Sequence, residues 1–249
     1  MRFVDYVDGY SIFRLVGRTR SSRSNVQTDA TSRTPWMDVS ATTWCKICGI
    51  TTLEDALAAA NAGVDAIGFN FFAASPRYVE PSCAADLCAS VNNVHPGVQR
   101  IGLFVDASAE TVFQVLDRVE LDLLQFHGDE SPEYCGQFQR PYIKVLGVSA
   151  TMDLAGLARS YHDAWGIILD THDPQLKGGT GRVFDWNLWP RNIDTRLILA
   201  GGLDPDNVAK AIEQTRPFGV DVAGGVESGQ KGVKDHGKMT IFIEKAKHG

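Results

Sequence analysis

The sequence predicts a single-domain α/β protein with the (β/α)8, or TIM barrel, architecture. Eight short apolar runs rich in β-branched residues follow one another from residue 44 onward, each followed by a helical pattern or a gap long enough for a helix. Two Gly-Gly turns follow the last two runs, where such barrels hold an anion. We therefore expect the barrel over residues 44–249, after a flexible extension over residues 1–43. A doubly wound open sheet is the alternative, but no GxGxxG pattern follows the first run.

The apolar runs define the expected strands, and polar residues after them mark helix starts. The expected strands are Trp44–Cys48, Ala66–Phe71, Arg100–Val105, Leu121–Phe126, Tyr142–Gly147, Gly166–Asp170, Arg196–Ala200 and Gly219–Ala223. Thr52 is typical of a helix N-cap and Gly63 of a helix end, which predicts the first helix between them. Segments 106–108 (Asp-Ala-Ser) and 129–132 (Asp-Glu-Ser-Pro) carry further start signals. The last helix is expected after residues 234–235.

The composition is that of an ordinary globular protein and argues against several classes of partner. Of 249 residues, 44% are hydrophobic and 22% are charged, so the chain can bury a sizeable core. The net charge of −6 gives no basis for binding nucleic acid or an acidic membrane surface. No apolar run approaches the roughly 20 residues of a membrane span, and acidic side chains stand where a secretory signal carries bases. Five scattered cysteines favour the reducing cytoplasm over a disulfide scaffold.

Residues 1–43 differ in composition from the rest of the chain. They are rich in Ser, Thr and Arg and show weak periodicity, which favours a flexible tail. An organelle-targeting segment and a start codon assigned too early are the alternatives.

A near-repeat close to the C-terminal end indicates a bound anion. Gly201-Gly202 and Gly224-Gly225 each follow an apolar strand run, and peptide N–H groups without nearby side chains can face a concave anion site. Tight turns would explain either pair alone, but two pairs after strands seven and eight match the phosphate site of (β/α)8 barrels. We therefore expect a phosphorylated small-molecule substrate. Between the pairs, Asp204 and Pro205 predict a helix N-cap and the first helical residue.

The carboxyl ends of the barrel strands select the candidate catalytic residues. Cys48 ends the first expected strand, and a thiol near a phosphate can act as nucleophile or general base in its thiolate form. Asp170 ends the sixth strand, where an apolar flank favours the protonated carboxyl group that a general acid needs. A buried cysteine can instead serve as a small hydrophobic residue, and a strand-end aspartate can cap a turn.

Other polar residues near the strand ends admit more than one interpretation. Arg77 falls in the loop after the second strand, and Asp221 lies within the eighth. His127 follows the fourth strand and is expected to be a structural hydrogen-bonding residue rather than a catalyst. Cys45 and Cys48 have the C-x-x-C spacing of a redox pair or half a zinc site, but strand alternation sends them to opposite faces.

A series of short motifs runs in order through residues 44–248. They are KICGIT at 46–51, IGF at 67–69, SPRYV at 75–79, GLFV at 102–105, LQFHG at 124–128, LDT at 169–171, GGTG at 178–181, LAGGL at 199–203, VDV at 220–222, GVE at 225–227 and GVKD at 232–235. Together they closely resemble the phosphoribosylanthranilate isomerases of tryptophan biosynthesis. The extension before Trp44 has no counterpart in this resemblance.

The resemblance implies a (β/α)8 enzyme that catalyses an Amadori rearrangement with no metal or organic cofactor. N-(5-phosphoribosyl)anthranilate becomes 1-(2-carboxyphenylamino)-1-deoxyribulose 5-phosphate, with Cys48 as general base and Asp170 as general acid. Arg77 matches the arginine that receives the anthranilate carboxylate, and Asp221 matches an acid that orients the substrate's amine or hydroxyls. The two Gly-Gly turns become the phosphate site. The oligomeric state is left open as monomer or homodimer.

Two segments bear on this assignment. Family members often carry serine after the eighth strand, where this chain has Ala223-Gly224, so hydroxyl contacts to the phosphate are lost while the backbone amides remain. Residues 177–182, Lys-Gly-Gly-Thr-Gly-Arg, are expected to form a mobile loop that closes over the substrate.

Two rival functions compete with this assignment. Indole-glycerol-phosphate synthase and an aminoaldose isomerase of histidine synthesis are also phosphate-binding barrels, but they need a catalytic strand lysine or an aspartate in place of Cys48. Lys46 and Lys144 are strand lysines, and Lys46 shares a strand face with Cys48. A catalytically silent barrel that serves as a scaffold is the second rival, against which the presence of Cys48, Asp170 and Arg77 argues.

Overall fold

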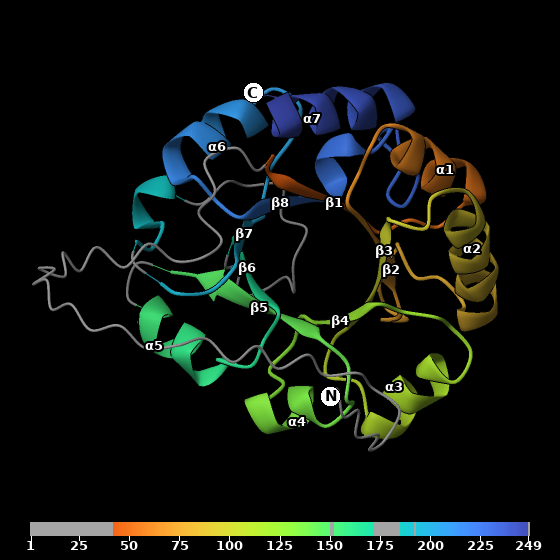
Figure 1. Ribbon diagram of the computed structural model, residues 1–249, viewed down its shortest axis with the longest axis horizontal. Helices are drawn as coiled ribbons and strands as arrows, with labels where there is room; N and C mark the ends of the chain where they lie inside the picture. The colour runs from red at the N-terminus through yellow and green to blue at the C-terminus, as the bar shows by residue number, and fades with distance from the viewer. Residues whose placement is uncertain (1–41, 150–151, 172–184, 192, 249) are drawn as a thin grey trace, which may run out of the picture. The chain divides into compact units, whose positions relative to one another are not determined.

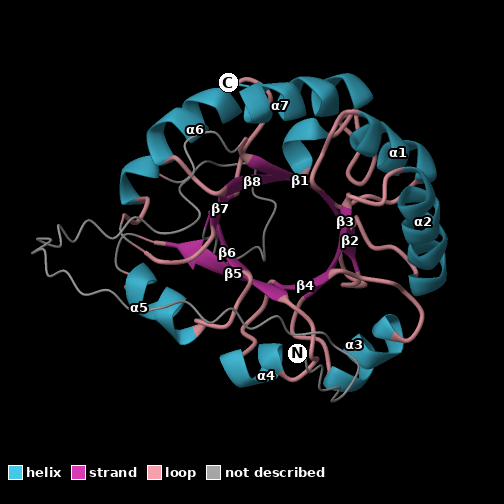
Figure 2. Cartoon of the chain, in the orientation of Figure 1, coloured by secondary structure: helices cyan, strands magenta, loops and turns pink. Residues whose placement is uncertain are grey.

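Eight parallel strands close into a barrel whose first and last members pair with each other. The computed structural model describes residues 42–149, 152–171, 185–191 and 193–248. The strands follow one another around the barrel in chain order, and β8 returns to β1 with Lys46 opposite Asp221. Figures 1 and 2 show the strands as an inner ring with the helices outside it. The predicted barrel is confirmed, and the open doubly wound sheet is excluded.

The strands lie where the apolar runs predict them. Their ends differ from the expected positions by at most two residues. The strands are β1 Trp44–Cys48, β2 Ala66–Asn70, β3 Gln99–Phe104, β4 Leu123–Phe126, β5 Tyr142–Val148, β6 Gly166–Thr171, β7 Leu197–Leu199 and β8 Gly219–Val222.

Helices follow the strands and cover the outside of the barrel. They are α1 Leu53–Asn61, α2 Pro81–Val94, α3 Ala109–Leu116, α4 Pro132–Gly136, α5 Leu154–Ser160, α6 Val208–Thr215 and α7 His236–His248, with short 3-10 segments η1 Trp186–Leu188 and η2 Gly224–Val226. None of the helices in the described ranges is long and apolar enough to cross a membrane. The predicted tail, apart from residues 42–43, and the predicted loop at 177–182 lie outside the described residues.

Side-chain caps start several helices at the predicted positions. Thr52, Ser108 and Ser131 each accept a hydrogen bond from a backbone N–H in the first turn of the following helix. The predicted start at Asp204 is wrong by three residues, because α6 begins at Val208 with Asn207 as its N-cap. The Asp204 carboxylate instead accepts from the backbone N–H groups of Asp206 and Asn207, and so caps a turn that precedes the helix.

The inward-facing side chains change character along the barrel axis. The floor, toward the amino ends of the strands, is an apolar cluster of Trp44, Ala66, Ile101, Leu123, Ile143, Val145, Ile168 and Ile198, and this cluster extends to Ala200 at the cavity. Above this floor, β1 and β8 place Lys46 opposite Asp221, and Cys48 follows one layer higher at the mouth. A larger apolar core fills the space between the strands and the helices, and Cys45 belongs to it.

Candidate active site

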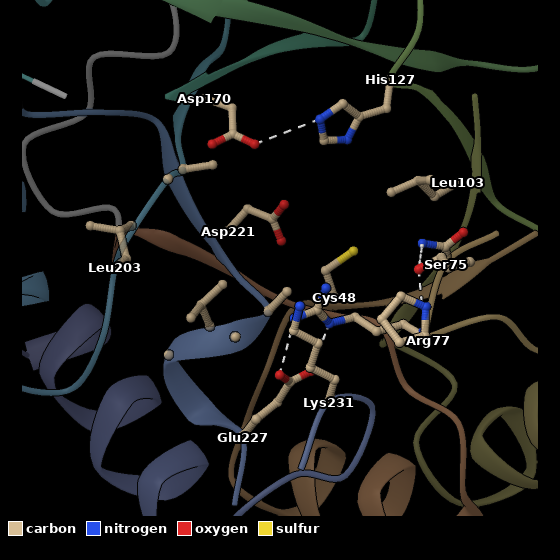
Figure 3. Close-up of a pocket in the computed structure, with 18 of the residues that line it drawn as sticks. Cys48, Ser75, Arg77, Leu103, His127, Asp170, Leu203, Asp221, Glu227 and Lys231 are labelled. Carbon is tan, nitrogen blue, oxygen red and sulfur yellow. Dashed lines mark hydrogen bonds and ion pairs between the residues drawn. The ribbon is translucent and has the colours of Figure 1, made fainter. Parts of the chain in front are cut away.

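A cavity of about 530 Å³ opens at the carboxyl ends of the strands, a volume that suits a small-molecule ligand. Its walls come from β1, β2, β3, β4, β6 and β8 and from the loops after β2, β7 and β8. All eight predicted site residues line it: Cys48, Arg77, Asp170, Gly201, Gly202, Asp221, Gly224 and Gly225. Figure 3 shows the side chains of Cys48, Asp170 and Asp221 converging on this common space.

Cys48 presents its thiol to the cavity at the end of β1. The residue is buried, with 6% of its surface exposed, and it packs with Leu103 and Val105 at the mouth of the barrel. Cys45 belongs to the outer core, so alternation separates the two cysteines onto opposite faces of β1 as predicted, and both are free thiols. Within the part of the chain that the structure describes, no three His, Cys, Asp or Glu side chains gather as a metal site would require.

Asp170 and His127 face each other across one side of the cavity (Figure 3). His127 Nε2 lies 3.6 Å from Asp170 Oδ2. Burial raises the pKa of the Asp170 carboxyl to about 6, and the negative charge of Asp221 adds to this against a hydrogen bond from the Thr171 N–H. Burial also lowers the pKa of His127 to about 4, which keeps its ring neutral at neutral pH. His127 therefore lies beside the predicted acid, a contact that the sequence analysis did not predict.

Asp221 stands on β8 between the two candidate catalytic groups. Its Oδ1 accepts a hydrogen bond from Lys46 Nζ at 3.0 Å, and both residues are buried. Lys46 points into the barrel on the same face as Cys48, as predicted, but it lies below the cavity and does not line it. Lys144 faces outward, where its Nζ lies 2.8 Å from Glu130 Oε2. Neither strand lysine therefore projects into the cavity as a catalytic lysine.

Arg77 is held by a carboxylate that the sequence analysis did not assign a role. Glu227, in the segment after β8, accepts from Arg77 Nε at 2.6 Å and from Nη2 at 3.0 Å. Burial alone would raise the pKa of the Glu227 carboxyl, but hydrogen bonds from Arg77 and the Gly232 N–H outweigh it and lower the pKa. Glu227 binds the edge of the guanidinium that carries Nε and Nη2. The edge that carries Nη1 and the second N–H of Nη2 is therefore available for another carboxylate.

Close approaches explain why the two Gly-Gly turns lack side chains. Gly201 has φ +84°, and a Cβ there would lie 2.7 Å from Asp170 Oδ1. A Cβ on Gly225 would lie 1.9 Å from the Leu203 carbonyl oxygen. Among the described residues, the N–H groups of Gly201, Gly202, Gly224 and Gly225 make no hydrogen bond. The two turns therefore border the cavity with backbone donors that an anion can use.

Comparisons with known proteins agree with one another. A family model described as N-(5′-phosphoribosyl)anthranilate isomerase matches residues 45–245. The N-(5′-phosphoribosyl)anthranilate isomerase of Hahella chejuensis is 52% identical over 199 residues, which cover 80% of this chain and 92% of the relative. Monomers of the dimeric phosphoribosylanthranilate isomerase of Thermotoga maritima align with a TM-score of 0.71 at 37% identity, over 82% of this chain and 98% of theirs. A phosphoribosylanthranilate isomerase in complex with reduced 1-(o-carboxyphenylamino)-1-deoxyribulose 5-phosphate also gives a TM-score of 0.71, at 39% identity and with the same coverage.

Proposed function

The chain belongs to the N-(5′-phosphoribosyl)anthranilate isomerase family, and we propose that Cys48 is the base and Asp170 the acid of its reaction. That reaction is the Amadori rearrangement of N-(5-phosphoribosyl)anthranilate to 1-(2-carboxyphenylamino)-1-deoxyribulose 5-phosphate, a step of tryptophan biosynthesis. The observation that carries the proposal is that both side chains open into one cavity whose rim carries an arginine and two glycine turns.

Asp170 supplies the first proton. Opening the furanose ring requires a proton on the ring oxygen, and the raised pKa of about 6 keeps part of the Asp170 population protonated near neutral pH. His127, neutral beside it, does not compete as an acid because its own pKa is only about 4. Ring opening gives a protonated Schiff base in conjugation with the aryl amine.

Cys48 takes the second proton. Its thiolate accepts the proton from C2, the C–H electron pair forms the C1–C2 double bond, and the iminium nitrogen regains its lone pair. The resulting enolamine tautomerises to the ketone, so the reaction is a net isomerisation. Two proton-transferring groups meet these demands, and we propose that no metal or organic cofactor takes part.

The remaining cavity residues bind the two ends of the substrate. The free edge of the Arg77 guanidinium suits the anthranilate carboxylate, because a planar fork binds a carboxylate through two hydrogen bonds. The N–H groups of Gly201, Gly202, Gly224 and Gly225 suit the phosphate, with Ala223 offering no hydroxyl. Asp221 orients the substrate's amine or hydroxyls.

We propose a cytoplasmic enzyme in which residues 1–43 form an extension outside the barrel domain of 44–249. The dimeric relative from Thermotoga maritima favours a homodimer over a monomer. Sedimentation equilibrium of the full chain distinguishes these two states.

A fluorescence assay of phosphoribosylanthranilate consumption tests the assigned roles. Cys48→Ala and Asp170→Asn are each expected to lower kcat by about 10²–10⁴-fold or more, because a general acid or base contributes that much. Cys45→Ala is the matched control, because that thiol sits three positions away on the outer face of β1 and should leave kcat unchanged. Near-wild-type turnover by Cys48→Ala or Asp170→Asn would refute the role of that residue. A competing phosphorylated aminoaldose in the same assay measures whether the site also takes the histidine-pathway type of substrate.

A further inference from the structure

A buried lysine lies directly below the thiol of Cys48. Lys46 is fully buried and precedes Cys48 by two positions on the inward face of β1. A Cβ built on Gly68 of β2 would lie 3.0 Å from Cys48 Sγ and 3.1 Å from Lys46 Nζ. The sulfur and the ammonium therefore touch the same small patch of the β2 backbone, and only a glycine leaves room for both.

The Lys46 side chain carries its charge at neutral pH. Burial alone would lower the pKa of the ammonium, but the Asp221 carboxylate and Cys48 outweigh burial, so the pKa is raised. The attraction acts in both directions, because an ammonium that is stabilised by the sulfur also stabilises the negative charge on the sulfur. The mechanism does not otherwise use Lys46, which does not line the cavity.

A second buried cation lies behind the same residue. Lys234 Nζ donates to the Cys48 carbonyl oxygen at 2.7 Å and to the Ala223 carbonyl oxygen at 3.0 Å. Its side chain is fully buried, and Glu227 Oε1 lies 3.6 Å away. Burial lowers the pKa of Lys234, while Glu227 and Cys48 act in the opposite direction. Lys234 thus holds the end of β1 through hydrogen bonds to two backbone carbonyl oxygens.

Several charged side chains of the described residues surround Cys48. Lys46, Lys234 and Arg77 are paired with the carboxylates Asp221 and Glu227, and Lys231 and Asp204 also line the cavity. Across the cavity, His127 is neutral and Asp170 has a pKa of about 6. Of these groups, Lys46 shares the inward face of β1 with Cys48 and lies directly below its sulfur.

We propose that Lys46 is a positioning residue that holds Cys48 as a thiolate, and that Asp221 limits how much of the lysine's charge reaches the sulfur. The inference rests on the proposed role of Cys48 as the base. It explains how a base is ready before substrate binds. It also predicts effects of opposite sign for two residues of one ion pair.

Titration of the thiol in the absence of substrate tests this proposal. The pH dependence of iodoacetamide alkylation at Cys48 is measured in a Cys83→Ser background, because Cys83 is the exposed cysteine of the described residues. In Lys46→Met the midpoint for thiolate formation should rise by about one to three pH units, the usual effect of one nearby charge. In Asp221→Asn the midpoint should fall, because Lys46 no longer shares its charge with a carboxylate. If the ion pair is purely structural, the midpoint in Lys46→Met stays unchanged.

Matched controls separate the charge effect from a loss of folding. Lys144→Met removes an equally buried lysine of another ion pair, on the outer side of β5, and should leave the midpoint unchanged. Burial raises the pKa of the Cys88 and Cys135 thiols to about 12 and that of Cys45 above its usual range, so these stay protonated. Subtracting the alkylation measured in Cys48→Ala from that of the parent protein leaves the alkylation of Cys48 alone.

The outcomes test the role of Lys46 and the role of Cys48 as the base separately. An unchanged midpoint in folded Lys46→Met, or a shift of the same sign in both variants, overturns the role of Lys46. If Lys46→Met does not fold, Lys46→Gln decides, because it removes the charge but keeps a polar group beside Asp221: a higher midpoint supports the role, and an unchanged or lower one overturns it. Normal turnover by Cys48→Ala together with the expected midpoints would sink the assigned base while leaving the thiolate pair intact.

Discussion

The floor and the mouth of the barrel are built from the same eight strands, yet they differ in what they contribute. The floor is apolar and closed by aromatic rings, with Trp44 5.5 Å from Trp165 and 6.3 Å from Phe218 between ring centroids. The mouth gathers ionisable side chains and bare glycine turns around a cavity. Burying apolar groups stabilises the fold, whereas desolvating Asp170 opposes it. The comparison indicates that the apolar floor stabilises the fold and offsets the cost of burying ionisable side chains at the mouth.

The two ends of the barrel also contain arginine–carboxylate pairs of the same geometry in different roles. Near the amino ends of β3 and β4, on the outer side of the barrel, Arg100 binds Asp122 through Nε at 2.8 Å and Nη2 at 2.9 Å. At the mouth, Arg77 binds Glu227 through the same two nitrogen atoms. Only Arg77 lines the cavity. The same geometry is therefore structural in one place and available to a substrate in the other.

The largest expected effect on stability comes from the floor. Trp44→Ala should lower the free energy of unfolding by about 3–5 kcal/mol, because it removes a buried ring from the aromatic cluster. Urea denaturation measures the loss. Below the unfolding transition, kcat and KM should match the wild type. A fall in kcat while the variant is fully folded would show that the floor and the mouth are not independent.

Asp170→Asn, a substitution at the mouth, should instead raise the free energy of unfolding. The pKa of Asp170 rises from 3.8 to about 6, so the folded state binds this proton more tightly than the unfolded state does. Wild-type stability therefore falls as pH rises between these two values, by up to about 3 kcal/mol. Asp170→Asn avoids this loss and should be the more stable protein above pH 6, although inactive. Denaturation curves across this pH range check the sign, and a constant difference between the two proteins would contradict it.

The arginine pair gives the next largest effect. Arg77→Met should raise KM by about 10–100-fold and change kcat less, because a charge-assisted hydrogen bond contributes about 1.5–3 kcal/mol to binding. Arg100→Met is the matched control, and it should lower stability while leaving KM unchanged. Steady-state kinetics with phosphoribosylanthranilate provides both numbers. An unchanged KM in Arg77→Met would remove the assigned carboxylate contact.

The smallest expected effect comes from the extension. Deletion of residues 1–40 should leave kcat and KM unchanged, because the family model begins to match at residue 45 and β1 begins at Trp44. Yield of soluble protein is the second readout. Loss of soluble protein on deletion would contradict the prediction and show that the extension contributes to the folded barrel.

Local patterns predicted most of the fold, because each depends on residues close together in the chain. β1 has the predicted bounds, and the caps at Thr52, Ser108 and Ser131 lie at the predicted positions. The predicted helix start at Asp204 is wrong because an aspartate followed by proline can cap a turn as well as a helix. The strand ends also predicted which side chains share one cavity.

Contacts between distant segments could not be predicted in the same way. The pairing of Arg77 with Glu227 joins residues 150 positions apart, and no periodicity in either segment indicates it. The position of His127 beside Asp170 depends on how β4 and β6 tilt around the barrel, which a single sequence does not encode locally. The strand-end rule predicted that Asp170 borders the site, but its contact with His127 could be identified only from the folded structure.

The seam between β1 and β8 has a consequence for synthesis of the protein on the ribosome. Cys48 emerges early, whereas Lys234, which grips its carbonyl oxygen, is added 186 positions later. The ring of strands also lacks its closing partner until β8 has been made. A nascent chain that lacks β8 and Lys234 therefore carries the sulfur without its surroundings, so the site cannot assemble before that segment has been made.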